Sequence, residues 1–172
     1  MFQSALAWLG AGATALALAL APAQAGSLAA PAGDVILTVT GKIGNSNTAD
    51  GAARFDLKML EEMASREGTM ETPWTKGQVT FKGPLGRALL EAVGAQGKTL
   101  KVLALDDYAV DVPVADLLDH DVMLATEMNG KPMSVRDKGP LFIIYPFDKE
   151  PGLYNEKYFS RSAWQIKTIV VN

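Results

Sequence analysis

The stretch ATEMNGKPMSVRDKGPLFIIYPFD, residues 125–148, decides the fold. An apolar run at residues 122–128 leads into Asn129-Gly130, the dipeptide most typical of a tight hairpin turn. A second apolar run, residues 141–145, follows the Gly139-Pro140 pair. Two buried strands are therefore predicted to present the loop between them, which is how binding sites are often built. That loop carries three charged side chains: Arg136, Asp137 and Lys138.

The amino-terminal segment predicts export. Residues 1–25 are almost entirely small and apolar and end in Ala23-Gln24-Ala25, an A-x-A cleavage pattern, so we expect a secretory signal peptide that is removed after Ala25. An uncleaved anchor is the alternative, although the apolar run is near the lower limit of about 17 residues for a membrane span. Residues 26–33 are predicted to form a flexible leader and residues 34–172 a single domain.

Composition excludes several classes of function. The net charge is −3 with no basic stripe, which disfavours nucleic-acid binding because that requires clustered Lys and Arg. The chain contains no cysteine, so it forms no disulfide and offers no thiolate to a metal. The single histidine, His120, is predicted to be exposed in a polar turn, which leaves no base for a Ser-His-Asp or Cys-His set.

Short strands with recurrent turns predict an α+β domain with a mixed β-sheet. We expect a tight hairpin at Asp106-Asp107 between two of these strands. We also expect a helix after the capping residue Asp56, at residues 57–64, and a helix from Pro84 to Val93 that ends at Gly94. A third short helix is expected at residues 114–118. The expected strands lie at residues 35–40, 79–81, 99–105, 108–112, 122–128, 141–145 and 163–171.

The domain also resembles a known family. The resemblance covers residues 34–171, and its specific motifs are EMNG-x-P at residues 127–132 and GPL at residues 139–141. The chain is similar to the molybdopterin-binding domain of the sulfite oxidase superfamily, and most similar to small exported periplasmic pterin-binding proteins that lack cysteine. The resemblance implies a sulfite-oxidase-type fold, a mixed β-sheet with short helices. The other matching positions are Tyr108, Pro113, residues 124–126, Met133, Pro146, Trp164 and Ile169.

This chain departs from the family pattern at two places, and these departures decide which ligand the resemblance implies. In the molybdenum enzymes of this superfamily a cysteine near residues 72–77 holds the metal, and this chain has none there, so molybdenum is not expected. A basic residue that precedes the last-strand tryptophan in those enzymes is replaced by Ala163. The resemblance therefore implies an unphosphorylated pterin of the neopterin or monapterin type as the ligand. It also implies a membrane signalling partner with cyclic-di-GMP cyclase and phosphodiesterase domains.

A pterin presents a flat face, an edge rich in N–H groups and a ring carbonyl. The predicted binding residues are Trp74, Tyr108 or Tyr145 against the face, Asp107 or Asp137 at the edge, and Arg136 or Arg161 on the carbonyl, with Met128 of the EMNG motif beside them. Structural roles stay open for several of these residues: Trp74 in the core, Arg136 paired with Asp137 on the surface, and Asp107 as a turn former. Two other functions also stay open, namely a molybdopterin-dependent oxidoreductase or its accessory subunit, and an interaction module that lost its ligand.

Overall fold

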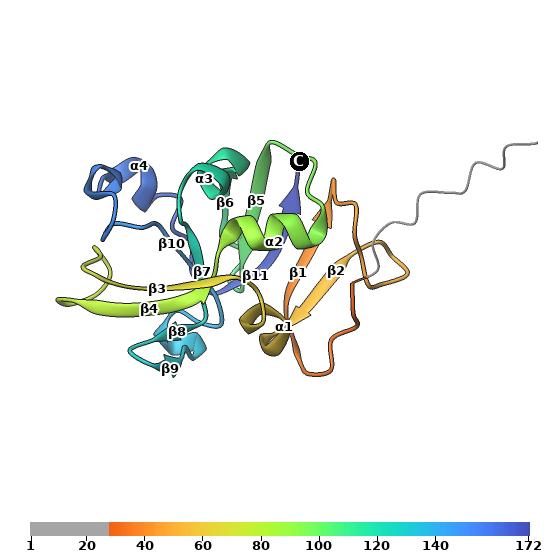
Figure 1. The fold of residues 1–172 in the computed structure, drawn as a ribbon, viewed down its shortest axis with the longest axis horizontal. Coiled ribbons are helices and arrows are strands. Elements are labelled where there is room, and N and C mark those ends of the chain that lie inside the picture. The colour runs from red at the N-terminus through yellow and green to blue at the C-terminus, as the bar shows by residue number, and fades with distance from the viewer. Residues whose placement is uncertain (1–27) are drawn as a thin grey trace, which may run out of the picture.

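The computed structural model describes residues 28–172, so the predicted signal peptide lies outside the described residues. Its larger sheet has five strands in the order β2-β1-β11-β5-β6 (Figure 1). The first and last strands of the domain, β1 and β11, pair in parallel with Thr38 opposite Thr168, and the other neighbours are antiparallel. The strands are β1 (Val35–Gly41), β2 (Ala53–Asp56), β5 (Thr99–Ala104), β6 (Ala109–Pro113) and β11 (Ile166–Val171).

A second sheet of four antiparallel strands has the order β3-β4-β8-β9, and β7 pairs with β10 in a separate antiparallel ribbon. The first two strands, β3 (Ser65–Met70) and β4 (Val79–Pro84), are long. The others are short: β7 (Met123–Ala125), β8 (Glu127–Met128), β9 (Lys131–Pro132) and β10 (Phe142–Ile144).

The stretch at residues 125–148 is organised largely as predicted. Ala125 of β7 lies opposite Phe142 of β10, and Asn129 and Gly130, both with positive φ, form the turn between β8 and β9. The predicted single strand at residues 122–128 is divided at the buried Thr126. At that point the chain leaves the ribbon and joins the four-stranded sheet, where the Thr126 N–H donates to the Lys82 carbonyl.

A close backbone approach connects the sheet to the ribbon. Gly83 of β4 is packed against β7, and a Cβ atom at this position would lie 2.2 Å from the Leu124 carbonyl oxygen. Only glycine permits this separation, because any side chain would collide with the neighbouring backbone.

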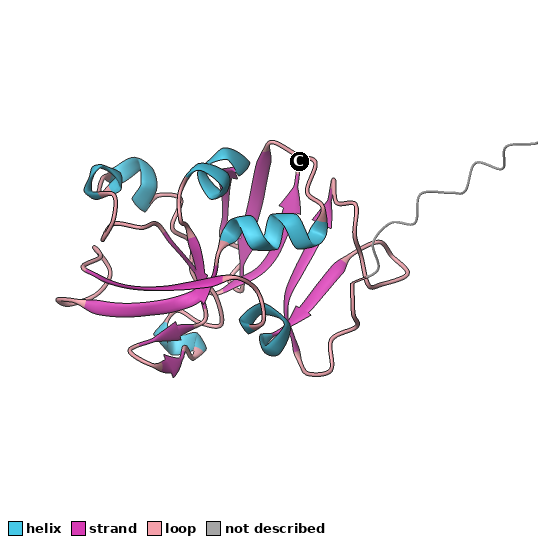
Figure 2. Ribbon diagram, in the orientation of Figure 1, coloured by secondary structure: helices cyan, strands magenta, loops and turns pink. Residues whose placement is uncertain are grey.

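Short helices surround the strands (Figure 2). The Asp56 side chain caps α1 through the Met59 N–H as predicted, and Gly94 ends α2 in the left-handed conformation. Pro84 is not the first helical residue, which corrects the prediction: it ends β4 opposite Ser65, a position at a strand end where proline is tolerated. The helices are α1 (Leu57–Glu61), α2 (Gly86–Val93), α3 (Val114–Asp119), α4 (Glu156–Phe159) and the 3₁₀ turns η1 (Val135–Asp137) and η2 (Pro151–Leu153).

The carboxylate of Asp56 also holds the segment before β1. One oxygen accepts the Met59 N–H at 2.9 Å, and the other accepts the N–H groups of Ala32 and Gly33 at 2.8 Å. These bonds, that of Met59 first, keep the pKa of Asp56 below its usual value. This end of the predicted leader is therefore attached to the domain.

One apolar core lies between the sheets and under α2, and its largest fully buried side chains include Phe55, Phe81, Phe142 and Tyr145. The α+β class with mixed sheets and few, short helices is confirmed. No helix within residues 28–172 has the length and apolar character needed to cross a membrane.

Candidate ligand-binding site

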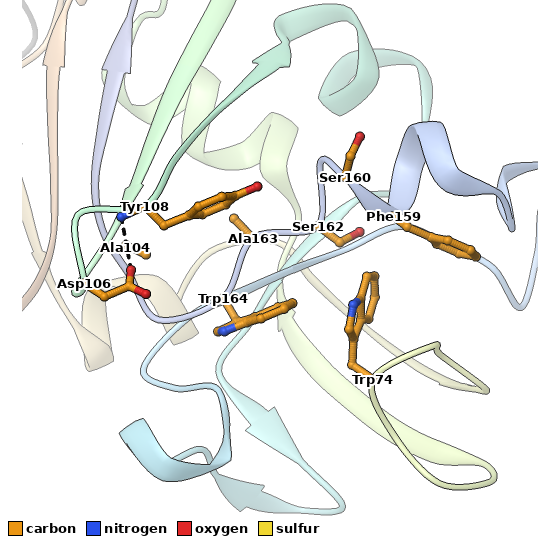
Figure 3. A pocket seen from close by; sticks show the side chains of 9 residues that line it. All are labelled: Trp74, Ala104, Asp106, Tyr108, Phe159, Ser160, Ser162, Ala163 and Trp164. Carbon is orange, nitrogen blue, oxygen red and sulfur yellow. Dashed lines mark hydrogen bonds between the residues drawn. The ribbon is translucent and has the colours of Figure 1, made fainter.

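An aromatic pocket of about 320 Å³ opens between the β5–β6 turn and the segment that joins α4 to β11 (Figure 3). Its volume falls at the lower end of the range for small-molecule sites, roughly 300–1,000 Å³. Larger hollows elsewhere on the described surface are shallow and open to solvent. We call it the aromatic pocket; it is lined by Trp74, Ala104, Asp106, Tyr108, Phe159, Ser160, Ser162, Ala163 and Trp164.

Trp74 closes one end of the pocket and is firmly held. A turn formed by Thr72 and Thr75, whose hydroxyl oxygens are 2.8 Å apart, presents the Trp74 backbone. The indole then makes edge-to-face contacts with three rings, Phe142 at 5.5 Å, Phe159 at 5.8 Å and Trp164 at 5.9 Å between centroids. Each such contact stabilises its geometry by about 0.5–1.5 kcal/mol, so Trp74 is a preorganised wall.

Tyr108 and Trp164 lie on two sides of the open space in Figure 3. Both rings are partly exposed, Tyr108 by 56% and Trp164 by 36%, and within residues 28–172 they make no ring contact with each other. Large exposed aromatic faces cost free energy in water unless a ligand covers them. The space between these two rings therefore suits a flat, apolar-faced molecule.

The polar groups of the pocket are the acceptors of Asp106, Ser160 and Ser162 and the uncharged donors of Tyr108, Trp74 and Trp164. One Asp106 oxygen accepts the Tyr108 N–H at 3.1 Å, and no described residue donates to the other. The hydroxyls of Ser160 and Ser162 donate to backbone carbonyls, those of Lys157 and Tyr158, each at 2.9 Å. Neither lysine nor arginine is among the lining residues.

Two of the predicted binding residues, Trp74 and Tyr108, line the aromatic pocket. Asp107 does not: it adopts a positive φ of 65°, and its carboxylate accepts from Lys167 Nζ at 2.7 Å. This bond lowers the pKa of Asp107. Asp107 is thus a turn residue, and its neighbour Asp106 supplies the carboxylate of the pocket.

Tyr145 and Arg161 meet at Asp116 of α3 instead of at the pocket. The fully buried Tyr145 hydroxyl and the Arg161 Nη1 each donate to Asp116 Oδ2 at 2.7 Å. Burial, and then the bond to Asp116, raise the pKa of Tyr145 far above its usual value, so the phenol stays protonated. Neither side chain lines the aromatic pocket.

The charged loop, residues 134–138, lies outside the pocket. Met128 and Asp137 line a separate shallow hollow beside the β8–β9 hairpin, and Arg136 is exposed. Asp137 accepts from the Ser134 hydroxyl at 2.7 Å, and no ion pair with Arg136 is present in the described chain. Only the last loop residue touches the site, because Lys138 Nζ sits 4.4 Å from the centroid of the Trp164 ring.

His120 differs from its prediction. It is half-buried, its Nδ1 lies 2.7 Å from Glu150 Oε2, and its ring contacts the edge of Tyr158 at 6.1 Å. The expected solvent-exposed histidine is therefore wrong, because residues 145–158 fold over the turn that carries it. His120 is not a lining residue of the aromatic pocket.

Sequence reasoning missed several lining residues. Trp164 was among the matching family positions, and Phe159, Ser160 and Ser162 occupy a polar, aromatic segment with no strong periodicity. Asp106 was identified only as part of a turn. The sequence signal that could have indicated these residues is the aromatic and polar composition of residues 153–164.

The residues present do not fit a molybdenum ion held by a cysteine thiolate. The sequence contains no cysteine. Within residues 28–172, no group of three or more His, Asp and Glu side chains could hold a metal ion. An organic ring, in contrast, finds aromatic faces and a carboxylate in the same cavity.

Comparisons with known proteins agree with this architecture. A sequence model described as the oxidoreductase molybdopterin binding domain matches residues 55–161. Among solved structures, the sulfane dehydrogenase SoxCD from Paracoccus pantotrophus matches with a TM-score of 0.57 and 17% identity over 78% of this chain. At this identity the match shows the fold alone, and this chain spans 37% of the length of the SoxCD chain. No curated protein matched the chain.

Proposed function

The chain belongs to the oxidoreductase molybdopterin-binding domain family, and on that premise we propose that it binds an unphosphorylated pterin in the aromatic pocket without catalysing a redox reaction. The observation that carries this proposal is the arrangement of Tyr108 and Trp164 beside the unpaired oxygen of Asp106. A pterin needs an aromatic surface for its face and an acceptor for its amino edge, and the pocket offers both.

The expected strength of binding is moderate. Stacking on an aromatic side chain contributes about 1–3 kcal/mol, and a hydrogen bond to a charged group about 1.5–3 kcal/mol. One stack, one bond to Asp106 and neutral bonds of about 0.5–1.5 kcal/mol to each serine oxygen sum to about 3.5–9 kcal/mol, so a Kd of about 1 μM, or about −8.2 kcal/mol, is the tightest binding expected. This affinity suits a protein that responds to the concentration of its ligand.

Titration with neopterin or monapterin tests the proposal. Two of the three tryptophans, Trp74 and Trp164, line the pocket, so stacking of a pterin should quench their fluorescence. Saturable quenching with a Kd between about 1 μM and about 1 mM is the expected result. No saturation below about 1 mM would refute pterin binding, because that corresponds to only about −4.1 kcal/mol.

Absence of redox activity is tested separately. The proposal expects no stoichiometric molybdenum in protein purified from a host that makes molybdenum cofactor, because the chain has no cysteine to bind the metal. One molybdenum atom per chain by elemental analysis, together with sulfite- or sulfane-oxidising activity, would establish the oxidoreductase alternative.

We also propose a periplasmic location and a regulatory role. The A-x-A pattern at residues 23–25 supports cleavage and export, and the family resemblance supports a membrane partner with cyclic-di-GMP domains. Mass spectrometry of the protein from a periplasmic extract should find an amino terminus at Gly26. Cellular cyclic-di-GMP should change on deletion of the gene only when pterin is present, and a pterin-independent level would refute the regulatory role.

A further inference from the structure

The charge of the aromatic pocket has one source. Asp106 is the only lining residue with an ionised side chain, and one of its oxygens has no donor within the described chain. The nearby cations are engaged elsewhere. Lys167 binds Asp107, Arg161 binds Asp116, and Lys138 lies over the Trp164 ring without lining the cavity.

Two serine hydroxyl groups add further hydrogen-bond acceptors to the pocket. The hydroxyls of Ser160 and Ser162 each donate their single proton to a backbone carbonyl. Toward a ligand, their oxygens therefore act as acceptors. In Figure 3 these serines lie at the opposite end of the cavity from Asp106. A ligand therefore meets acceptors at both ends and aromatic rings between them.

An anionic substituent finds no cation among the residues that line this cavity. A carboxylate is acceptor-only, so beside Ser160 and Ser162 it would meet two further acceptors, and the donors that line the cavity, the Tyr108 hydroxyl and the two indole N–H groups, are uncharged. It would also share the cavity with the Asp106 carboxylate, and like charges repel each other. A hydroxymethyl group, which carries its own O–H donor, meets neither penalty.

We propose that the pocket selects its pterin by charge: Asp106 accepts the amino edge of the ring, while Ser160 and Ser162 accept a neutral, donor-bearing ring substituent and exclude an anionic one. This inference rests on the proposed function and deepens it, because it assigns the specificity-determining residues and the ligand class. Pterins with a hydroxylated side chain fit the class, whereas rings with a carboxylate, glutamate or phosphate substituent do not.

A matched pair of ligands tests the selection. The probes are 6-hydroxymethylpterin and pterin-6-carboxylate, which share the ring and differ at one substituent. Calorimetric titration of the full chain at pH 7 should give a Kd about tenfold or more higher for the carboxylate. Equal affinities would overturn the charge selection and leave pterin binding intact. If neither ligand bound, the proposed function itself would fail.

Two variants locate the substituent end. Ser160 is exposed and tolerates a longer side chain, and Ser160→Lys places a cation there. We expect this variant to bind pterin-6-carboxylate about tenfold more tightly than the wild-type chain does, and 6-hydroxymethylpterin more weakly, because that ligand loses the Ser160 acceptor. Ser160→Gln is the control, with added length and no charge, and should show no gain. An equal gain in both variants, or none in either, would overturn the assignment of Ser160.

A substitution at Asp106 examines the other end. Asp106→Asn keeps the shape of the side chain but removes its charge, so the affinity for 6-hydroxymethylpterin should fall about tenfold. The ratio of the two Kd values, for pterin-6-carboxylate over 6-hydroxymethylpterin, should also become smaller. Thermal unfolding compared with the wild type shows whether the variant is folded. An unchanged affinity and an unchanged preference in a folded Asp106→Asn chain would contradict the role of this carboxylate.

Discussion

The aromatic pocket and the charged face around α3 differ in whether their polar groups have partners within the protein. In the pocket, an Asp106 oxygen and two serine oxygens point to open space without a donor. On the charged face, the carboxylates of Asp116, Asp121 and Asp148 are paired with cations, although the buried Arg66 Nε has no hydrogen-bond partner within the described residues. Its ion pairs are Arg66–Asp148, Arg87–Asp121, Lys149–Asp121 and Arg161–Asp116. Satisfied groups stabilise a fold, whereas unsatisfied ones beside a cavity are available to a ligand. The two regions should therefore respond differently to mutation.

The largest expected effect is on the charged face. Asp116→Ala leaves the Arg161 guanidinium and the buried Tyr145 hydroxyl without their shared acceptor, so the free energy of unfolding should fall by about 2–4 kcal/mol. Urea denaturation measures this loss. The affinity for neopterin should stay unchanged, since none of the three residues lines the pocket.

Asp116→Asn serves as the control for this substitution, because it retains an acceptor oxygen and should lose less stability. A tenfold loss of pterin affinity in a folded Asp116→Ala chain would bring Tyr145 or Arg161 back into the site and break the contrast between the regions.

The second-largest expected effect is a loss of ligand affinity in the aromatic pocket. Trp164→Ala removes a stacking face, so the free energy of pterin binding should weaken by about 1–3 kcal/mol, or roughly 5- to 150-fold in Kd. Fluorescence of the remaining Trp74 or calorimetry measures the change. Arg136→Ala is the matched control, because Arg136 is exposed and lies outside the lining set. Equal losses in both variants would place the charged loop in the site.

A smaller effect, on the pH dependence of stability, is expected for Asp121 on the charged face. Lys149 and then Arg87 lower the pKa of Asp121 to about 2 in the folded chain, from 3.8. Because the folded pKa is depressed, the stabilisation is complete above pH 3.8 and is lost as the pH falls through 2. Asp121→Asn should thus cost about 1 kcal/mol at pH 7 after screening by solvent, and only a small part of that at pH 2, where about half of the folded carboxyls are protonated. Chemical denaturation at the two pH values would reveal a constant difference if the prediction is wrong.

The smallest effect separates two adjacent carboxylates. Asp107 is fully exposed and bonds Lys167 on the surface, so Asp107→Asn, which also tolerates the positive φ, should change neither the denaturation midpoint nor pterin affinity measurably. The same substitution at Asp106 should weaken pterin binding. A loss of affinity at position 107 instead would reverse the assignment of the two residues.

The strands and turns were largely predictable because local chemistry determines them. The Asn129-Gly130 turn, the Asp56 cap and the Gly94 helix end all formed as expected. β3 was missed because its sequence SREGTM is polar and buries little besides Gly68 and Met70, so it carries no apolar alternation.

The site was only partly predictable, since it joins segments far apart in the chain. Trp74 and Tyr108 were identified as aromatic platforms, and the structure places both at the pocket. Asp107 was preferred to Asp106 because no sequence pattern reveals which residue of a turn takes the positive φ. Tyr145 and Arg161 look like ligand contacts in sequence, but a third residue, Asp116, binds both of them.

The bare α-carbon of Gly83 has an influence well beyond its own strand. It lets β4 rest on the backbone of β7, and β7 carries β10, whose Phe142 ring supports the edge of Trp74. A methyl group at position 83 would push the ribbon away from the sheet and move that support. Geometry at the ligand cavity is thus fixed partly by a missing side chain in a strand that never reaches it.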